Sequence, residues 1–353
     1  MQPFLFILVI FNTLVALGLM LAYLGRRGDK EEACESDVLR VIIVVPLKGI
    51  DLDLRENLIS LTSQDFKEFR ILGVVDSPDD PALRIATELG IECVTSDFPC
   101  RRCSGKVRAI STALPKAKSF DVIVVADSDI RVERQWLRCL VSPLSDRGTG
   151  VSTTFPSFYP EGGFWSRVKM FWGTVGQSMM ESGITRFVWG GSMAFRSELI
   201  DEEFIKEFSE SISDDVSVMR IVKSRGLKIG YVPSSRPMVH TDDDFPKFLE
   251  WANRQTSLSI SSSKRIFIFG VIYFGFSFYL IASAIALSFL NPVFLAFLFP
   301  YAFNSVRSEL RNPVRTWYFP VITLMLPVVY LYNLTSGLRM REIEWRGRIY
   351  RLR

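Results

Sequence analysis

Apolar residues are distributed unevenly along the chain. A nearly uncharged apolar run from Pro3 to Leu24 has about the length that an α-helix needs to cross a bilayer. A second apolar stretch, from Ile266 to Phe303, is too long for one span and is interrupted near its middle by Asn291-Pro292. A third stretch runs from Trp317 to Leu334 and contains prolines. This pattern predicts membrane segments on both sides of a water-soluble region.

Basic residues beside the first apolar run predict its orientation. Arg26, Arg27 and Lys30 follow the run at once, so residues 1–25 are expected to form a transmembrane helix whose C-terminal end is cytosolic. A cleaved signal peptide is disfavoured, because the run is long and lacks a basic start and a clear cleavage site.

Residues 264–338 are predicted to form a C-terminal membrane region. The favoured arrangement is a tight helical hairpin over residues 266–303, followed by a re-entrant or interfacial segment. The alternative has two spans, at Ile266–Leu290 and Trp317–Leu334. The hairpin arrangement keeps the basic tail 339–353 in the cytosol, as the charge rule favours. The prediction is an integral, multi-pass membrane protein with its catalytic domain in the cytoplasm.

The region between the apolar runs has the pattern of an α/β domain, here placed at residues 38–260. Short β-branched apolar runs occur at 38–45, 70–75 and 121–126, and each leads into a polar loop and a helix-like stretch. This alternation predicts a Rossmann-like, mostly parallel sheet with helices on its faces. Ligands of such sheets bind at the carboxyl ends of the strands.

Composition supports a mixed molecule and excludes some functions. Hydrophobic residues make up 48% of the chain, yet 23% of residues are charged, which is typical of membrane segments joined to a soluble domain. No basic run alternates with aromatic residues, so no nucleic-acid partner is expected. The five cysteines are odd in number, which argues against a disulfide framework and favours reduced thiols.

The strongest local signal is a pair of carboxylates. Asp127 and Asp129 directly follow the apolar run that ends at Ala126, so both are predicted at the carboxyl edge of the sheet. Oxygen ligands suit Mg²⁺ or Mn²⁺, and such an ion neutralises a diphosphate leaving group. Most Asp-x-Asp pairs are solvated turn carboxylates, so the motif alone does not establish a metal site.

Three further segments could build a nucleotide-sugar site. Pro46 and Lys48 lie in the turn after the first strand, Asp76 ends another strand, and Lys106 lies upstream of Asp127. These residues could contact the base, ribose or phosphates of a donor. Ordinary turn chemistry and a solvated lysine are the alternative explanations.

Two adjacent carboxylates, Asp214 and Asp215, precede a stretch of helical periodicity. They could stabilise the helix N-terminus, or one could act as a general base that deprotonates an acceptor hydroxyl. We expect Asp214 to be nearer the capping role and Asp215 nearer the base.

The order of these motifs resembles that of the inverting GT-A-type glycosyltransferases of families 2 and 21, and most closely the ceramide glucosyltransferase branch. The similar segments, in chain order, are Pro46-Leu-Lys-Gly49, Asp76 with Asp79-Asp80-Pro81-Ala82, Gly105-Lys106, Asp127-Ser-Asp129-Ile-Arg-Val132, Gly190-Gly-Ser-Met-Ala-Phe-Arg196, Asp214-Asp215 with Arg225-Gly226, and Trp345-Arg-Gly-Arg348-Ile-Tyr-Arg-Leu352. The resemblance covers the chain from about residue 38 onward.

The chain departs from the family where a Gln/Arg-x-x-Arg-Trp motif is usual. The nearest equivalent is Trp251-Ala-Asn-Arg254-Gln255, so acceptor identity is the property placed in doubt. An interfacial tryptophan and a lipid-facing arginine are the alternative explanation. His240, the only histidine, could be a further metal ligand, although a lone histidine is more often structural. The next acidic residues, 242–244, are predicted to form a solvated loop.

The resemblance implies a single in-line displacement with inversion. Asp127 and Asp129 would hold Mg²⁺ or Mn²⁺ on the diphosphate of a UDP-hexose, and Asp215 would deprotonate the hydroxyl of a ceramide-like lipid or glycerolipid. The residues implied on the acceptor and leaving-group side are Gly190, Gly191, Asp214, Trp251 and Arg254. The rival readings are a polyisoprenyl-phosphate glycosyltransferase, a processive polysaccharide synthase and an inactive membrane scaffold.

Overall fold

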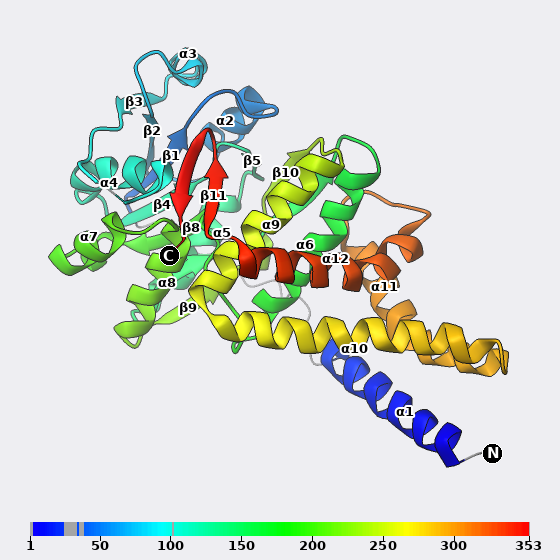
Figure 1. Ribbon diagram of the computed structural model, residues 1–353. Helices are drawn as coiled ribbons and strands as arrows, with labels where there is room; N and C mark the ends of the chain where they lie inside the picture. Colours follow the sequence, from blue (N-terminus) through cyan, green and yellow to red (C-terminus); the bar gives the residue numbers. More distant parts are fainter. Residues whose placement is uncertain (1–2, 25–33, 35–38, 101, 353) are drawn as a thin grey trace.

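The computed structural model describes residues 3–24, 34, 39–100 and 102–352. Its centre is a seven-stranded sheet with the order β3-β2-β1-β4-β8-β6-β9 (Figure 1). The strands are β1 (Val41–Leu47), β2 (Phe69–Val75), β3 (Glu92–Thr95), β4 (Val122–Ala126), β6 (Thr149–Thr153), β8 (Ser192–Arg196) and β9 (Lys228–Tyr231). Only β8 runs antiparallel to its neighbours, so the predicted mostly parallel sheet is confirmed.

Strand β1 shows why the sheet forms where it does. Its apolar residues are buried on both faces, as is usual for a central parallel strand. Ile42 and Val44 face α4 (Gly105–Ala117), α7 (Glu202–Ser209) and α8 (Asp214–Ser224) in one core cluster. Val41, Ile43 and Val45 face the opposite cluster. The helices of that second cluster include α2 (Leu54–Thr62), α5 (Trp136–Val141), α6 (Phe164–Glu181) and α9 (Phe245–Ser262).

A second sheet extends the edge where the strands end. It contains β5 (Ile130–Arg131), β10 (Met238–Thr241) and β7 (Ser157–Pro160). In its antiparallel register Val239, the residue before His240, lies opposite Ile130, the residue after Asp129. Shorter connecting elements are α3 (Pro81–Glu88), η1 (Ser142–Ser145), η2 (Ser197–Leu199) and η3 (Pro233–Ser235).

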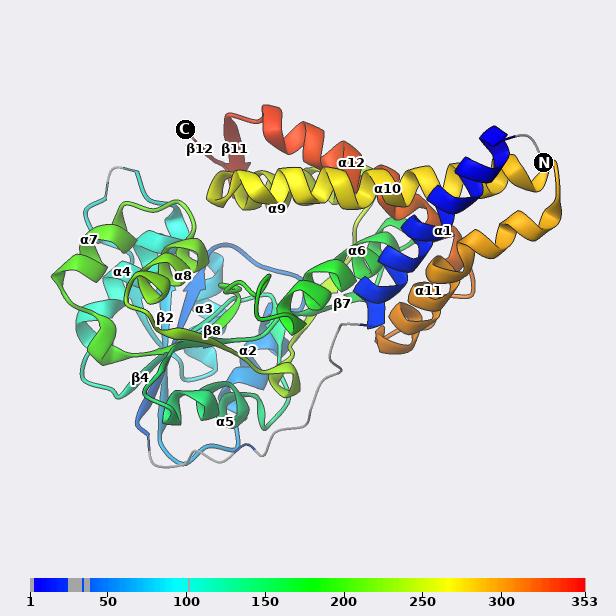
Figure 2. The same ribbon diagram turned by 90° about the horizontal axis from the view of Figure 1, so that it is seen from below.

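Long apolar helices gather at one end of the sheet domain (Figures 1 and 2). Among the described residues, three helices are long and apolar enough to cross a membrane. They are α1 (Pro3–Leu24), of which Leu5–Leu24 meets this criterion, α10 (Lys264–Ser288) and α12 (Phe319–Arg339). After α10 the chain turns at Asn291 and returns through η4 (Pro292–Leu298) and α11 (Phe299–Arg311). The basic residues Arg26, Arg27 and Lys30, on which the predicted orientation depends, lie outside the described residues.

The membrane-type helices pack on one another and on the sheet domain. Leu19 and Tyr23 of α1 share a cluster with Leu280 of α10 and Tyr301 of α11. Residues of α10 and α12 also belong to the larger core cluster of the sheet domain, which includes Tyr330. The core of the soluble part therefore continues into the apolar helices.

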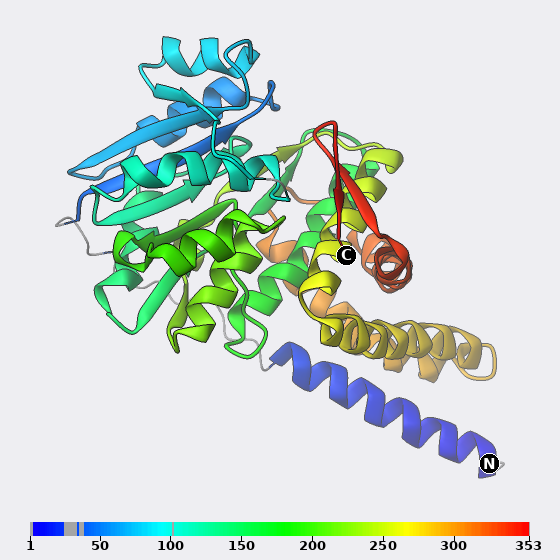
Figure 3. The ribbon, with the colours of Figure 1, turned by 60° about the vertical axis from the view of Figure 1, so that its left-hand side comes forward.

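The segment predicted as a basic tail has regular structure. Glu342–Trp345 (β11) and Arg348–Arg351 (β12) form an antiparallel hairpin immediately after α12. Figure 3 shows this hairpin standing between α12 and the sheet domain.

The cysteines differ from the sequence prediction. Cys34 is bonded to Cys139, and Cys100 is bonded to Cys103, whereas Cys93 is free. The expectation of reduced thiols throughout was therefore wrong. Distance along the chain hid the first pair, because 105 residues separate its members.

A close approach in α6 provides a test of this packing. A Cβ at Gly173 would lie 2.5 Å from the ring of Phe158 in β7, whereas a Cβ at Gly183 would meet no atom within 4 Å. We expect Gly173→Ala to lower the free energy of unfolding by about 1–3 kcal/mol through overpacking. Thermal unfolding in detergent would show a lower melting temperature for Gly173→Ala and little change for the control Gly183→Ala. Equal melting temperatures would contradict the packing described.

Candidate functional site

The carboxyl ends of β1, β2 and β4 bring the predicted donor-side residues together. Lys48 follows β1 and its ammonium lies 3.2 Å from the carboxylate of Asp76, which follows β2. Pro46 lies within β1 and pairs with Val74 of β2. Asp127 follows β4, and its backbone N–H donates to the carbonyl of Gly191 at 3.0 Å. These residues share one edge of the sheet, as expected for a parallel arrangement.

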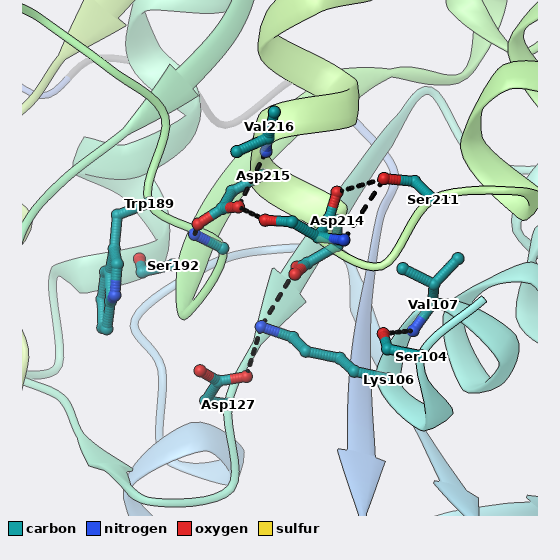
Figure 4. Close-up of polar contacts among 12 residues, drawn as sticks. Ser104, Lys106, Val107, Asp127, Trp189, Ser192, Ser211, Asp214, Asp215 and Val216 are labelled. Atoms are coloured by element: carbon teal, nitrogen blue, oxygen red, sulfur yellow. Dashed lines mark hydrogen bonds and ion pairs between the residues drawn. The ribbon is translucent and has the colours of Figure 1, made fainter. Parts of the chain in front are cut away.

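A buried lysine connects the two sides of this edge. The ammonium of Lys106 lies 2.7 Å from Asp127 and 3.0 Å from Asp214 (Figure 4). Ser104 caps α4 by accepting the N–H of Val107 at 3.2 Å, which fixes the first turn that carries Lys106. Burial alone would lower the pKa of Lys106, but the two carboxylates outweigh it and raise that pKa. Lys106 is therefore a charged residue, and the alternative of a solvated lysine is wrong.

Asp129 lies among other carboxylates. Burial raises the pKa of Asp129 to about 7, and the charges of Asp127 and Asp51 add to the rise. Asp51 accepts a hydrogen bond from Ser128, the residue between the two metal-motif carboxylates. Concentrated negative charge of this kind is stabilised by a cation.

Asp214 and Asp215 have different surroundings from those predicted. Ser213 is the N-cap residue of α8, and Asp214 is buried and paired with Lys106, so its predicted capping role was wrong. Burial raises the pKa of Asp214 to about 6 against the opposing charge of Lys106. Asp214 does not cap the helix because it is the first residue of α8 and its side chain is buried.

The carboxylate of Asp215 is held by backbone groups. It accepts the N–H of Val216 at 2.7 Å and that of Gly190 at 3.3 Å, and the hydroxyl of Ser213 also donates to it (Figure 4). These bonds fix the orientation of the Asp215 carboxylate at the strand edge.

Because Gly190 and Gly191 have no side chains, the Asp214 carboxylate and the Trp189 ring can lie close to their backbone. A Cβ at Gly190 would lie 2.4 Å from the carboxylate of Asp214, and one at Gly191 would lie 2.2 Å from the ring of Trp189. Any larger residue would displace Asp214 or Trp189. The structure thus brings Gly190 to the carboxylates of α8 and joins Gly191 to the backbone of Asp127.

His240 lies beside carboxylates at the same edge. Its Nδ1 is 2.6 Å from Glu161 and 3.6 Å from Asp53, and these three residues place possible ligand atoms within 4.8 Å of one another. Its Nε2 is buried and has no hydrogen-bond partner. With Nδ1 held by Glu161, Nε2 is free to act as a ligand.

Trp251 and Arg254 belong to α9 and pack inward. The ammonium of Lys169 lies 4.5 Å from the ring centroid of Trp251, whose ring also meets that of Trp172 at 4.9 Å. Arg254 is largely buried, pairs with Glu250 at 3.1 Å, and its pKa is lowered by burial. The alternative of an interfacial tryptophan and a lipid-facing arginine does not fit this packing.

One acidic residue of the predicted solvated loop is buried. Asp243 pairs with Lys169 at 3.1 Å, and the two side chains are 9% and 10% exposed. Asp244 caps α9 by accepting the N–H of Lys247 at 2.9 Å. The expectation of a solvated loop was wrong for Asp243, because its partner lies 74 residues away in α6.

Several residues of the site were not predicted from the sequence. Asp51, Asp53, Glu161 and Arg346 come from loops and turns with no strong local pattern. Arg346 donates to the carbonyl of Lys48 and, at 2.7 Å, to Asp51. The signal available for Arg346 was its place in the segment Trp345–Leu352, which is one of the segments that resemble the family.

The site combines groups that suit a charged substrate. Carboxylate oxygens and a free imidazole nitrogen can hold a divalent cation, and lysine and arginine can hold an anion. A separate, oriented carboxylate, that of Asp215, can accept a proton.

Comparison with known families gives a match over nearly the whole chain. The family model described as glycosyl transferase family 21 matches residues 5–353.

One solved structure supports the same fold, and a second is similar over a smaller part of the chain. The mannosyltransferase PcManGT from Pyrobaculum calidifontis, solved with GDP-Man and Mn²⁺, is 16% identical with a TM-score of 0.55, covering 94% of this chain and 97% of that one. Glucosyl-3-phosphoglycerate synthase from Mycobacterium tuberculosis, solved with Mn²⁺, UDP-glucose and phosphoglyceric acid, is 16% identical with a TM-score of 0.46. That match covers 67% of this chain and 85% of the synthase. Together with the sheet described above, the similarity to PcManGT confirms the predicted GT-A-type fold.

The buried position of Lys106 leads to a stability prediction. We expect Lys106→Met to lower the free energy of unfolding by about 3–5 kcal/mol, because Asp214 would stay buried without its cation. Since the pKa of Asp214 is already raised, the uncompensated carboxylate is tolerated below that pKa and becomes costly as pH rises through it. Thermal unfolding in detergent should show a smaller deficit at about pH 5 than at about pH 8.

A second substitution controls this experiment. Lys106→Met combined with Asp214→Asn removes the uncompensated charge and should recover part of the lost stability. A deficit that is equal at both pH values, and that Asp214→Asn does not reduce, would contradict the proposed ion pair.

Proposed function

Because the chain belongs to glycosyl transferase family 21, we propose that it transfers a hexose from a nucleotide-diphosphate donor to the hydroxyl of a membrane lipid, with inversion. The chain is a glycosyltransferase by family and fold. The observation that carries the finer proposal is the convergence of four carboxylates around the buried Lys106. Asp127 and Asp214 pair with it directly, and its charge also acts on Asp129 and Asp215. This convergence supports a charged donor on one side and a proton acceptor on the other.

The donor side is assigned to the loops after β1, β2 and β4. Lys48 and Asp76, with Pro46 in the strand beside them, would receive the base and ribose, and Lys106 and Asp127 would adjoin the phosphates and sugar. UDP-glucose is the donor we propose, on the resemblance of the motif order to the ceramide glucosyltransferase branch. The pairing of Lys48 with Asp76 at 3.2 Å keeps both residues at the strand ends.

The residues present fit a divalent metal. Asp127 and Asp129 would hold Mg²⁺ or Mn²⁺, and His240 would add its unpartnered Nε2. His240 follows Val239, which pairs with Ile130, the residue after Asp129, and this neighbouring position along the two strands supports the set. When bound, the ion neutralises negative charge on the diphosphate. PcManGT, which shares the fold, was solved with Mn²⁺.

Asp215 is the group we assign to the chemical step. The acceptor oxygen attacks the anomeric carbon while Asp215 takes the hydroxyl proton. The new bond joins that oxygen to the sugar, and the bond between the sugar and the diphosphate breaks with its electrons leaving on the phosphate. Hydrogen bonds from Gly190 and Val216 hold the Asp215 carboxylate in place for this transfer.

The acceptor side is assigned to the region where α6 and α9 meet α12. Trp172 of α6 stacks on Tyr330 of α12 at 5.0 Å and meets Trp251 of α9. Arg254 would lie on the leaving-group side. We propose that a lipid hydroxyl approaches Asp215 from the side of α12, with the sheet domain in the cytoplasm. Ceramide-like lipids and glycerolipids both offer such a hydroxyl.

The first test is a donor-and-lipid screen with Mn²⁺ on the detergent-purified protein. We expect lipid-dependent nucleotide release that falls at least about 10²-fold in Asp129→Ala, because the diphosphate charge is no longer neutralised. The extracted product's mass identifies the acceptor and the mass class of the sugar. Glu203→Ala, which removes an exposed carboxylate in α7, is the matched control. Release that is unchanged in Asp129→Ala would overturn the metal assignment.

The second test separates the base from donor binding. Asp215→Asn keeps the size of the side chain but removes the proton acceptor, so transfer should fall about 10²–10⁴-fold while donor affinity stays near that of the wild type. Transfer rates and nucleotide binding would be measured on the same preparation. Full activity of Asp215→Asn would point instead to a phosphate acceptor such as a polyisoprenyl phosphate, which needs little deprotonation.

A further inference from the structure

The C-terminal hairpin contacts the loops after β1 and β2 and the start of α4, beside the proposed donor side. Arg346 reaches the loop after β1, through the carbonyl of Lys48 and the carboxylate of Asp51. Arg348 pairs with Asp76 after β2 at 2.8 Å. The hydroxyl of Tyr350 accepts the N–H of Gly105, at the start of α4, at 3.1 Å. The hairpin therefore covers the carboxyl edge of the sheet, as Figures 1 and 3 show.

The tip of the hairpin has an unusual backbone. Trp345 pairs with Arg348, so Arg346 and Gly347 form a two-residue loop. Both have positive φ, 50° for Arg346 and 73° for Gly347. Turns of this kind favour glycine, asparagine or aspartate at the first position, and an arginine there is disfavoured. Its presence at this position indicates that the side chain is used for something other than the turn.

The cations around the site differ in their ability to bind a further anion. Lys106 is 10% exposed and already contacts two carboxylates, and Arg254 is 16% exposed and pairs with Glu250. The side chain of Arg346 is 36% exposed, and its guanidinium has more N–H donors than its two contacts use. Arg346 is thus better placed than Lys106 and Arg254 to donate hydrogen bonds to phosphate oxygens.

Arg346 is also tied to the metal-motif carboxylates. Its partner Asp51 accepts a hydrogen bond from Ser128, between Asp127 and Asp129. The positive charge of Arg346 acts on Asp129 from this position. An anion bound between the motif and the hairpin would therefore meet Arg346 directly.

We propose that Arg346 is a donor-binding residue whose guanidinium pairs with the diphosphate of the nucleotide sugar and with the leaving nucleoside diphosphate. This inference rests on the proposed function, because it requires a nucleotide-diphosphate donor at the same edge. Arg348 and Tyr350 are positioning residues that anchor the hairpin to β2 and α4. The planar guanidinium suits two phosphate oxygens at once, which a lysine cannot reproduce.

The test is a binding experiment on the full-length, detergent-purified protein with Mn²⁺. Affinities for UDP and GDP are compared with those for uridine and guanosine, which lack the diphosphate. In Arg346→Gly the turn becomes more favourable, so a binding defect does not arise from loss of the hairpin. Arg346→Lys keeps the positive charge, and Arg346→Asn removes it while introducing a residue that this turn favours. Arg351→Gln is the control, because Arg351 is 83% exposed and pairs with Glu342 within the hairpin.

We expect Arg346→Gly and Arg346→Asn to weaken nucleoside-diphosphate binding about 10–100-fold, the range for hydrogen bonds to charged groups. Nucleoside binding and the Arg351→Gln control should not change, and Arg346→Lys should restore only part of the affinity. Diphosphate affinity within about twofold of the wild type, or an equal loss for nucleosides, would overturn the role of Arg346 alone. A wild-type protein that binds neither diphosphate would overturn the proposed function, and this role with it.

Discussion

The ion pairs of Lys106 are the interaction on which the rest of the site depends. This lysine joins Asp127, at the end of β4, to Asp214, at the start of α8, inside the protein. A buried cation between two carboxylates is stable only if all three groups stay together, because each would be costly alone. The pairing therefore sets the distance between the donor-side strand and the helix that carries Asp215. It also explains why Gly190 is needed, since a side chain there would enter the same space.

The sequence predicts well those features that depend on local pattern. The apolar strand before Asp127 and the apolar run of β1 predicted the parallel sheet and the edge at which the candidate site lies. The sequence does not predict pairs formed by distant residues, such as Lys169 with Asp243 or His240 with Glu161. In these pairs each charged residue looks like a surface residue in its own segment, and only the packing of α6 and the second sheet buries or joins them.

The apolar helices are structurally joined to the catalytic part. Trp172 stacks on Tyr330 of α12, and its indole N–H donates to Asn333 at 3.3 Å. The side-chain amide of Asn333 in turn donates to the side-chain oxygen of Asn253 in α9 at 2.8 Å. A candidate membrane-spanning helix thus supplies polar partners to the sheet domain. This contact suits the proposed reaction, in which one substrate is dissolved in water and the other is held in lipid.

The position of the hairpin late in the chain has a consequence for biogenesis. Only Met340 and Arg341 separate α12 from β11. Since a ribosome delivers elements in chain order, the sheet domain with its carboxylates emerges first, α12 follows, and the hairpin that covers the strand ends comes after both. The carboxyl ends of the strands therefore stay uncovered until α12 has been made. The proposed donor side is in this way completed only after the candidate membrane-spanning helices have been synthesised.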